Sequence, residues 1–193
     1  MNKLFLETIK VQNFQPYNLF YHEKRMNNSV IGVSDTFELK SIIKPPTKDL
    51  YRCRIVYSKN SLEISYHSYK KRDIKKLKLV ESDIVYDKKY ANRDELDNLY
   101  QQKDFYDDIL IVKNGYITDT SIANIAFFDG KKWLTPIYPL LYGTTRERLL
   151  STKFLEESHI SVDDISKFTK VALMNAMIDF DIIAEENIKE IIC

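Results

Sequence analysis

The residues with the clearest chemical potential lie between Gly143 and Glu147, in the order Gly-Thr-Thr-Arg-Glu. Thr144 and Glu147 have the spacing of a capping box, which predicts that a helix begins here. The first backbone N–H groups of a helix have no partner within it and favour an anion, above all a phosphate. An ordinary capped helix has the same sequence, so this segment alone leaves both interpretations open.

Basic residues at two other places could serve the same chemistry. Arg25 follows His22 on a segment with helical spacing, and an arginine can hold a phosphate through two parallel hydrogen bonds. Lys88 and Lys89 follow an apolar stretch, and partial desolvation of a lysine held between two lobes would favour the neutral, nucleophilic amine. Taken alone, each position is more typical of a solvated surface residue.

A run of small polar residues crosses between two apolar segments within residues 107–130. The apolar segments end at turns, Asn114-Gly115 and Asp129-Gly130, and read as strands. Buried polar groups need hydrogen-bond partners, so the crossing indicates either a satisfied hairpin or the wall of a ligand site. The crossing contains Thr118, Asp119, Thr120, Ser121 and Asn124.

The elements that must position these residues alternate between strand and helix patterns. Pro45-Pro46 must end the second of the helices, which opens at Asp35 and carries Phe37. We therefore expect an α/β fold in two lobes, with a small N-terminal α/β lobe over 1–86 and a C-terminal lobe over 87–193. The expected strands cover 3–11, 51–57, 62–69, 77–86, 133–136, 171–174 and 178–183, and the expected helices 18–26, 35–43, 92–100, 145–155 and 161–168.

The composition argues against several classes of protein. The 29 basic and 28 acidic residues leave a net charge of +1, so neither nucleic acid nor an anionic membrane surface is an expected partner. Cys53 and Cys193 form no C-x-x-C pair, which argues against a disulfide framework and a metal site. No apolar run reaches the length of a membrane span, so we expect a cytoplasmic protein.

The order of these candidate residues along the chain resembles that of the class IV aminotransferases, the fold type IV pyridoxal-phosphate enzymes. The resemblance extends from about residue 4 to about residue 180, and each element is weak by itself. Its elements are Glu7-Thr8, His22 with Arg25, Lys89, Gly115, Asp119, Ser121, Asn124, Thr135-Pro136, Gly143 to Arg146 and Asn175-Ala176.

The resemblance implies a homodimer in which pyridoxal 5'-phosphate lies between the two lobes. Lys89 matches the Schiff-base lysine that moves protons at the substrate Cα. Its spacing to Asn92-Arg93 selects it over Lys88, and strand alternation puts the two lysines on opposite faces. Asp119 matches the acid beside the pyridine nitrogen, although that acid is usually a glutamate, one methylene longer.

The phosphate contacts follow from the same resemblance. Arg25 and the first turn after Gly143, with Thr144 and Thr145, match the residues that hold the cofactor phosphate. Ser121 or Asn124 would lie nearby.

The substrate is less sharply defined because the first lobe is short. Four residues are candidates to line its pocket: Tyr21, Arg52, Arg54 and Tyr86. The pattern Lys-x-x-Asn-Arg resembles 4-amino-4-deoxychorismate lyase, which releases p-aminobenzoate and pyruvate, more than the branched-chain transaminases. The alternatives are an aminotransferase acting on a branched-chain or D-amino acid with a 2-oxo acid, and a non-catalytic binding protein that keeps the fold.

Overall fold

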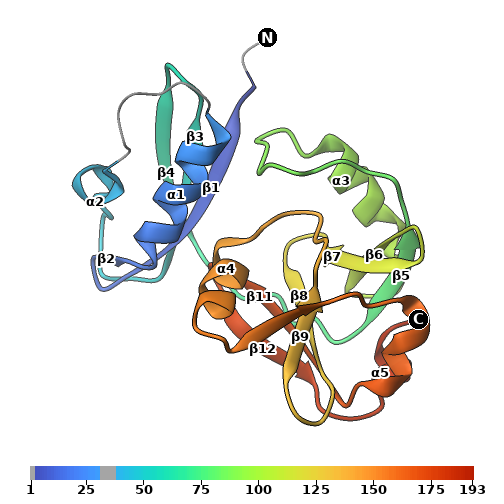
Figure 1. Ribbon diagram of the computed structural model, residues 1–193. Coiled ribbons are helices and arrows are strands. Elements are labelled where there is room, and N and C mark those ends of the chain that lie inside the picture. The colour runs from blue at the N-terminus through green and yellow to red at the C-terminus, as the bar shows by residue number, and fades with distance from the viewer. Residues whose placement is uncertain (1–2, 31–37) are drawn as a thin grey trace. The chain divides into compact units, whose positions relative to one another are not determined.

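The computed structural model describes residues 3–30 and 38–193, which fold into two compact units (Figure 1). The first unit contains the chain up to Lys71 together with Lys88–Asn92, and the second contains Arg72–Asp87 and Arg93–Cys193. The chain therefore leaves the first unit, returns to it for five residues, and leaves again. The lobes expected from the sequence, 1–86 and 87–193, did not include this exchange.

The first unit is an antiparallel sheet in the strand order β2-β1-β3-β4. Its strands are β1 (Phe5–Gln12), β2 (Gln15–Pro16), β3 (Tyr51–Tyr57) and β4 (Leu62–Ser68), and its helices are α1 (Leu19–Ser29) and α2 (Leu39–Ile42). Figure 1 shows α1 lying against one face of this sheet. Met26 of α1 packs there against Ile9, Cys53 and Ile55, all fully buried.

Period-two alternation divides the residues of β1 between the two faces of this sheet. Phe5, Ile9 and Val11 point toward the helix and into the core, and the charged Glu7 stands among them with no solvent exposure. The opposite face carries Leu6, Thr8 and Lys10. One charged residue is thus forced into the core of the first unit and must find partners there.

Lys88–Asn92 extends this sheet along the free edge of β1. The backbone N–H of Leu6 donates to the carbonyl of Lys89 at 2.8 Å, and that of Ala91 donates to the carbonyl of Leu4 at 2.9 Å. Phe5 and Tyr90 pair between these bonds, and their rings stack with centroids 5.7 Å apart. The segment that carries the two lysines is therefore fixed to the edge of β1 by an isolated bridge at Tyr90, just after a turn in which the N–H of Tyr90 donates to the carbonyl of Lys88 at 2.8 Å.

The second unit is built on a mixed sheet in the order β10-β9-β8-β7-β6-β5, with β11 pairing to β8 and to β12. The pairs β5–β6 and β9–β10 are parallel, and the others are antiparallel. Its strands are β5 (Leu77–Glu81), β6 (Asp108–Lys113), β7 (Tyr116–Thr120), β8 (Asn124–Phe128), β9 (Trp133–Pro136), β10 (Leu155–Ser158), β11 (Lys170–Asn175) and β12 (Asp179–Ala184).

The helices of the second unit are short. They are α3 (Asp94–Tyr100), α4 (Thr144–Ser151), α5 (Ile188–Ile191) and the 3₁₀ helices η1 (Gln101–Lys103) and η2 (Val162–Lys167). In α4, Leu149 is buried and packs with Leu155, Ala126 and Met174 from the sheet. This places α4 against β8, β10 and β11, and β8 begins at Asn124 of the polar crossing.

The mixed α/β architecture confirms the expected fold class, with some local differences. The helix predicted over 145–155 is too long: Lys153 has a left-handed backbone (φ 59°), and Leu155 instead opens β10, where it is buried beside β9. The strand predicted to reach Tyr86 ends at Glu81. Of the helix predicted over 35–43, Asp35 and Phe37 lie outside the described residues.

No helix among the described residues is both long enough and apolar enough to cross a membrane.

Candidate active site

Three charged or polar residues meet in the core of the first unit. The guanidinium of Arg25 donates to Glu7 through two nitrogens, Nε to Oε1 at 2.7 Å and a terminal nitrogen to Oε2 at 2.6 Å. His22 Nδ1 lies 2.6 Å from the same Oε2. Strand β1 supplies the carboxylate, and successive turns of α1 supply its two partners. The Glu7, His22 and Arg25 elements of the motif are therefore in mutual contact.

These contacts decide the charge of Glu7. Burial alone would raise its pKa, but the charge and hydrogen bonds of Arg25, together with those of His22, lower the pKa to about 2. Burial lowers the pKa of His22, which favours the neutral ring, so His22 must donate from Nδ1 to the ionised carboxylate. Glu7 thereby fixes the plane of the guanidinium and takes up its bidentate edge formed by Nε and one terminal nitrogen.

The structure distinguishes the two neighbouring lysines. Lys88 Nζ donates to the carbonyl of Ser29 in α1 at 3.1 Å and lies 5.7 Å from the centre of the Phe5 ring. Lys88 is thus held on the helix side of the sheet. The backbone N–H of Tyr90 donates to the carbonyl of Lys88 at 2.8 Å and closes a turn centred on Lys89, so strand alternation does not decide where the Lys89 side chain lies. The charge of Lys89 contributes, as the smallest cause, to the lowered pKa of His22, the neighbour of Arg25 in the Glu7 cluster. These placements favour Lys89 as the reactive amine, which stays a prediction.

In the second unit, Asp119 and Asn124 face each other across the pair β7–β8. Asn124 Nδ2 donates to Asp119 Oδ1 at 2.7 Å and to the carbonyl of Leu141 at 2.8 Å. The backbone N–H of Leu141 donates to Asp119 Oδ2 at 2.8 Å. Both side chains are almost fully buried. The polar crossing is hydrogen-bonded to the loop that precedes α4, and both carboxylate oxygens of Asp119 accept a bond.

The environment of Asp119 suits a cationic ligand group. Burial raises its pKa to about 7, although the hydrogen bonds from Leu141 and Asn124 and the charge of Arg146 act in the opposite direction. A carboxyl poised in this way gains strongly from a cation placed against it. Each oxygen keeps a second lone pair that could accept from a protonated pyridine nitrogen. The residues present therefore fit the cofactor implied by the sequence.

Helix α4 begins at Thr144, as the sequence predicted, but the predicted capping box is wrong. The N-cap is Gly143, no side chain caps the helix, and Glu147 is linked to Gly143 by a backbone bond of 2.9 Å. A Cβ atom at Gly143 would overlap the amide oxygen of Asn124, so only glycine fits here. Thr144 and Thr145 are buried in this uncapped first turn, which is the geometry that favours a phosphate.

Arg146 is a residue to which the sequence assigned no role of its own. One of its terminal nitrogens donates to the carbonyl of Pro136 at 2.8 Å and to Glu157 at 2.7 Å, so it ties α4 to β9 and β10. It is buried, and its Nε has no partner among the described residues. Its charge also lowers the pKa of Asp119. Its position directly after the two threonines is the sequence feature that could have identified Arg146 as a site residue.

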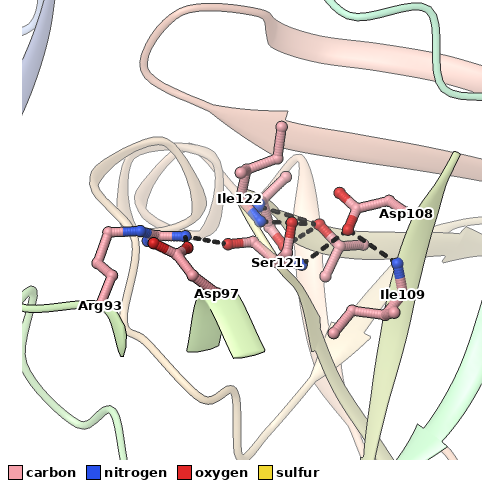
Figure 2. A network of polar contacts seen from close by, with 8 residues as sticks. Arg93, Asp97, Asp108, Ile109, Ser121 and Ile122 are labelled. Atoms are coloured by element: carbon pink, nitrogen blue, oxygen red, sulfur yellow. Dashed lines mark hydrogen bonds and ion pairs between the residues drawn. The ribbon is translucent and has the colours of Figure 1, made fainter. Parts of the chain in front are cut away.

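The backbone of Ser121 is held from two sides, as Figure 2 shows. A terminal nitrogen of Arg93 donates to the carbonyl of Ser121 at 2.9 Å, and the N–H of Ser121 donates to Asp108 Oδ1 at 3.4 Å. The same oxygen accepts from the N–H of Ile109 at 2.8 Å, while Oδ2 is buried with no partner among the described residues. The Arg93 of the Lys-x-x-Asn-Arg pattern therefore holds the polar crossing.

The four substrate candidates lie in different surroundings. Tyr21 is half-buried on α1, with its ring edge-on to Phe20. Tyr86 is buried in the second unit, where Arg93 lies 5.9 Å from the centre of its ring. Arg52 and Arg54 share the sheet face opposite to Glu7. Tyr86 belongs to the second unit and the other three residues belong to the first. Their contact with substrate stays a prediction.

Comparison with known proteins identifies a family and similar folds. Residues 4–184 match the family model described as amino-transferase class IV. An uncharacterised protein of Haemophilus influenzae is 37% identical over 180 residues, which is 89% of this chain and 96% of that protein.

Two solved structures have a similar fold. A crystal structure from Haemophilus somnus, described as that of a candidate 4-amino-4-deoxychorismate lyase, is 32% identical with a TM-score of 0.84 and covers 92% of this chain and 97% of its own. A hypothetical aminotransferase of Mycobacterium tuberculosis, solved with pyridoxal phosphate bound, has a TM-score of 0.74 at 15% identity and covers 93% and 80%. The second likeness concerns the fold alone.

The raised pKa of Asp119 predicts a pH dependence of cofactor binding. Binding a cationic ring nitrogen stabilises the ionised form, so below about pH 7 binding must release a proton and the affinity must fall. We expect the dissociation constant of pyridoxal phosphate to rise as pH falls from about 8 to about 6, by up to about tenfold per unit.

The Asp119→Asn variant provides the control for this measurement. The cofactor phosphate also titrates near this range, so the component due to Asp119 is the difference between the two proteins, measured by titrating cofactor against Trp133 fluorescence. The same pH dependence in both would contradict the assignment.

The hydrogen bond from Arg93 to the carbonyl of Ser121 predicts that Arg93 influences cofactor binding by fixing the polar crossing. Arg93→Met removes a charged hydrogen bond of a kind that contributes roughly 1.5–3 kcal/mol, so we expect cofactor affinity to fall about tenfold or more. Lys131→Met is the control, because Lys131 is an exposed cation of the same unit in the turn between β8 and β9. An equal loss of affinity in both variants, or no loss in Arg93→Met, would show that the hydrogen bond from Arg93 to Ser121 does not position the cofactor site.

Proposed function

The chain belongs to the class IV aminotransferase family, whose members are pyridoxal-phosphate-dependent enzymes, and we propose that it acts as a lyase on 4-amino-4-deoxychorismate. The observation that carries the proposal is the similarity, over nearly the whole length of both chains, to the Haemophilus somnus protein described as a candidate for that activity. The contact of Arg93 with Ser121 supports it further, because it gives the Lys-x-x-Asn-Arg pattern a structural role.

Each residue of the proposed site has a separate task. Arg25, oriented by Glu7, and the first turn of α4 at Thr144 and Thr145 hold the cofactor phosphate. Asp119 accepts from the pyridine nitrogen, with Ser121 and Asn124 around it. When bound, pyridoxal phosphate supplies an electron sink for the carbon that loses a proton. Lys89 carries the cofactor and then takes that proton from the amine-bearing carbon of the substrate.

The proposed reaction needs no second substrate. After the proton leaves the amine-bearing carbon, the bond from the neighbouring carbon to the enolpyruvyl oxygen breaks, and the ring becomes aromatic. The products are p-aminobenzoate and enolpyruvate, and the latter takes up a proton to give pyruvate. A transaminase would use Lys89 and Asp119 in the same places but would transfer the amino group and therefore require a 2-oxo acid as second substrate.

A homodimer and a cytoplasmic location remain part of the proposal. Both rest on the family rather than on a contact or signal in this chain.

The assignment of Lys89 predicts the spectrum of the purified protein. We expect added pyridoxal phosphate to give the absorbance band of a lysine-bound cofactor, and we expect Lys89→Ala to abolish that band. Lys88→Ala is the matched control and should keep it, because Lys88 donates to Ser29 instead. Loss of the band in Lys88→Ala with retention in Lys89→Ala would assign the cofactor to Lys88 instead. Absence of the band in the wild-type protein would contradict the proposal that the protein is a pyridoxal-phosphate enzyme.

The lyase proposal predicts product formation from one substrate. Incubation of the cofactor-loaded protein with 4-amino-4-deoxychorismate should release pyruvate and p-aminobenzoate in equal amounts without an added 2-oxo acid. Amino transfer to 2-oxoglutarate without pyruvate release would instead identify an aminotransferase.

A further inference from the structure

The loop that completes the hydrogen bonds of Asp119 has no regular secondary structure. Residues 137–143, which we call the 137–143 loop, connect β9 to α4 and contain neither a helix nor a strand. The N–H of Leu141 in this loop donates to Asp119 Oδ2 at 2.8 Å, and its carbonyl accepts from Asn124 Nδ2 at 2.8 Å. The environment of Asp119 therefore depends on a segment that no helical or sheet hydrogen-bond ladder holds in place.

The side chain of Arg146 contacts this loop at both ends. One terminal nitrogen donates at 2.8 Å to the carbonyl of Pro136, the residue directly before the loop. The guanidinium carbon lies 5.6 Å from the centre of the ring of Tyr142, the neighbour of Leu141. The same terminal nitrogen donates to Glu157 of β10 at 2.7 Å, which orients the guanidinium. One side chain of α4 thus joins the beginning and the end of the loop to the sheet.

Stability alone does not explain an arginine at this position. Arg146 is only 3% exposed, and its Nε has no partner among the described residues. Removing a guanidinium from water is costly, and an apolar side chain of similar volume would fill the same space without that cost. The ring of Tyr142, in contrast, is 55% exposed, so apolar burial contributes little to holding this end of the loop. The contact with the arginine is then its main restraint.

We propose that Arg146 is a positioning residue, which holds the 137–143 loop in the conformation in which Leu141 donates to Asp119. Arg146 acts on a ligand through the loop and Asp119 and is not itself a catalytic residue. The inference rests on the proposed function only for the identity of that ligand, the cationic pyridine nitrogen. The contacts that hold the loop are present without it.

Removal of Arg146 should change the titration of Asp119 in one direction. The groups that oppose the effect of burial on the pKa of Asp119 are the backbone of Leu141 and Leu140, the side chain of Asn124 and the charge of Arg146, and each lowers that pKa. A loop that moves away takes the bond of Leu141 with it, and the substitution also removes the positive charge. Both losses favour the protonated carboxyl, so the pKa must rise above its present value of about 7.

The test measures the loop and the carboxyl separately, by NMR on the cofactor-free protein. The exchange rate of the Leu141 amide reports how often its bond to Asp119 opens, and the Asp119 Cγ shift reports the titration. We expect Arg146→Met to accelerate this exchange at least about tenfold and to raise the pKa of Asp119. Arg148→Met is the matched control and should change neither, because Arg148 lies on the same helix but pairs with Asp179.

A second variant separates positioning from charge and is expected to fold, because the side chain it alters is exposed. Tyr142→Leu removes the ring that Arg146 contacts and leaves every charge in place. We expect it to accelerate exchange of the Leu141 amide about two- to fivefold. Unchanged exchange in Tyr142→Leu would overturn the proposal, whether or not Arg146→Met folds. An equal acceleration in Arg148→Met would also overturn it.

The titration decides whether the loop matters for the site. Faster exchange of Leu141 in Arg146→Met with an unchanged pKa of Asp119 would show that the loop does not control the carboxyl, and would overturn the proposal. When pyridoxal phosphate is added, the pH below which affinity falls should move upward in Arg146→Met by the same amount as the pKa. A wild-type protein that binds no cofactor would contradict the proposed function alone, since the exchange and titration measurements need no cofactor.

Discussion

A carboxylate removed from water must acquire partners, and each unit of this protein meets that constraint differently. In the first unit, Glu7 stands on the core side of β1, and α1 places Arg25 and His22 against it, which keeps it charged with a pKa of about 2. In the second unit, only neutral donors touch Asp119, and burial raises its pKa to about 7. Glu7 has its cationic partner within its own unit, whereas Asp119 would be stabilised by a cation from outside the chain.

Strand alternation then decides which residues can act together. Glu7 and Arg54 are on neighbouring strands of one sheet but point to opposite faces, because Thr8, not Glu7, lies opposite Arg54. The two lysines are separated by their contacts instead, because Lys88 is bound to α1 through Ser29 and a backbone turn between Lys88 and Tyr90 sets the course of the chain at Lys89. The backbone pairing of Lys88–Asn92 with β1 fixes this turn in the first unit.

Local patterns predicted the parts of the structure that local forces determine. The strands over 51–57 and 62–69 follow from their period of two. The start of α4 lies where the sequence predicted it, although the expected capping box does not form and Gly143 is the N-cap. The end of α4 does not, because pairing of Leu155 with β9 overrides its helical spacing. Arg93 and Ser121 are 28 residues apart, and no local signal could reveal their contact. Sequence order suggested the site residues, but only the fold shows that Glu7 orients Arg25.

The shorter acid at position 119 is matched by the residues around it. Asp119, Asn124 and the backbone of Leu141 form a closed set of hydrogen bonds, and the Asn124 amide occupies the space where any residue but glycine at 143 would place its Cβ. A glutamate at 119 would carry its carboxyl one methylene farther and could not keep the same bonds without moving Asn124 or the loop. The shorter side chain requires a ligand to approach β7 more closely. The hydrogen bonds that fix the Asp119 carboxyl offset this requirement, because a fixed acceptor loses less conformational entropy when a ligand binds than a mobile one.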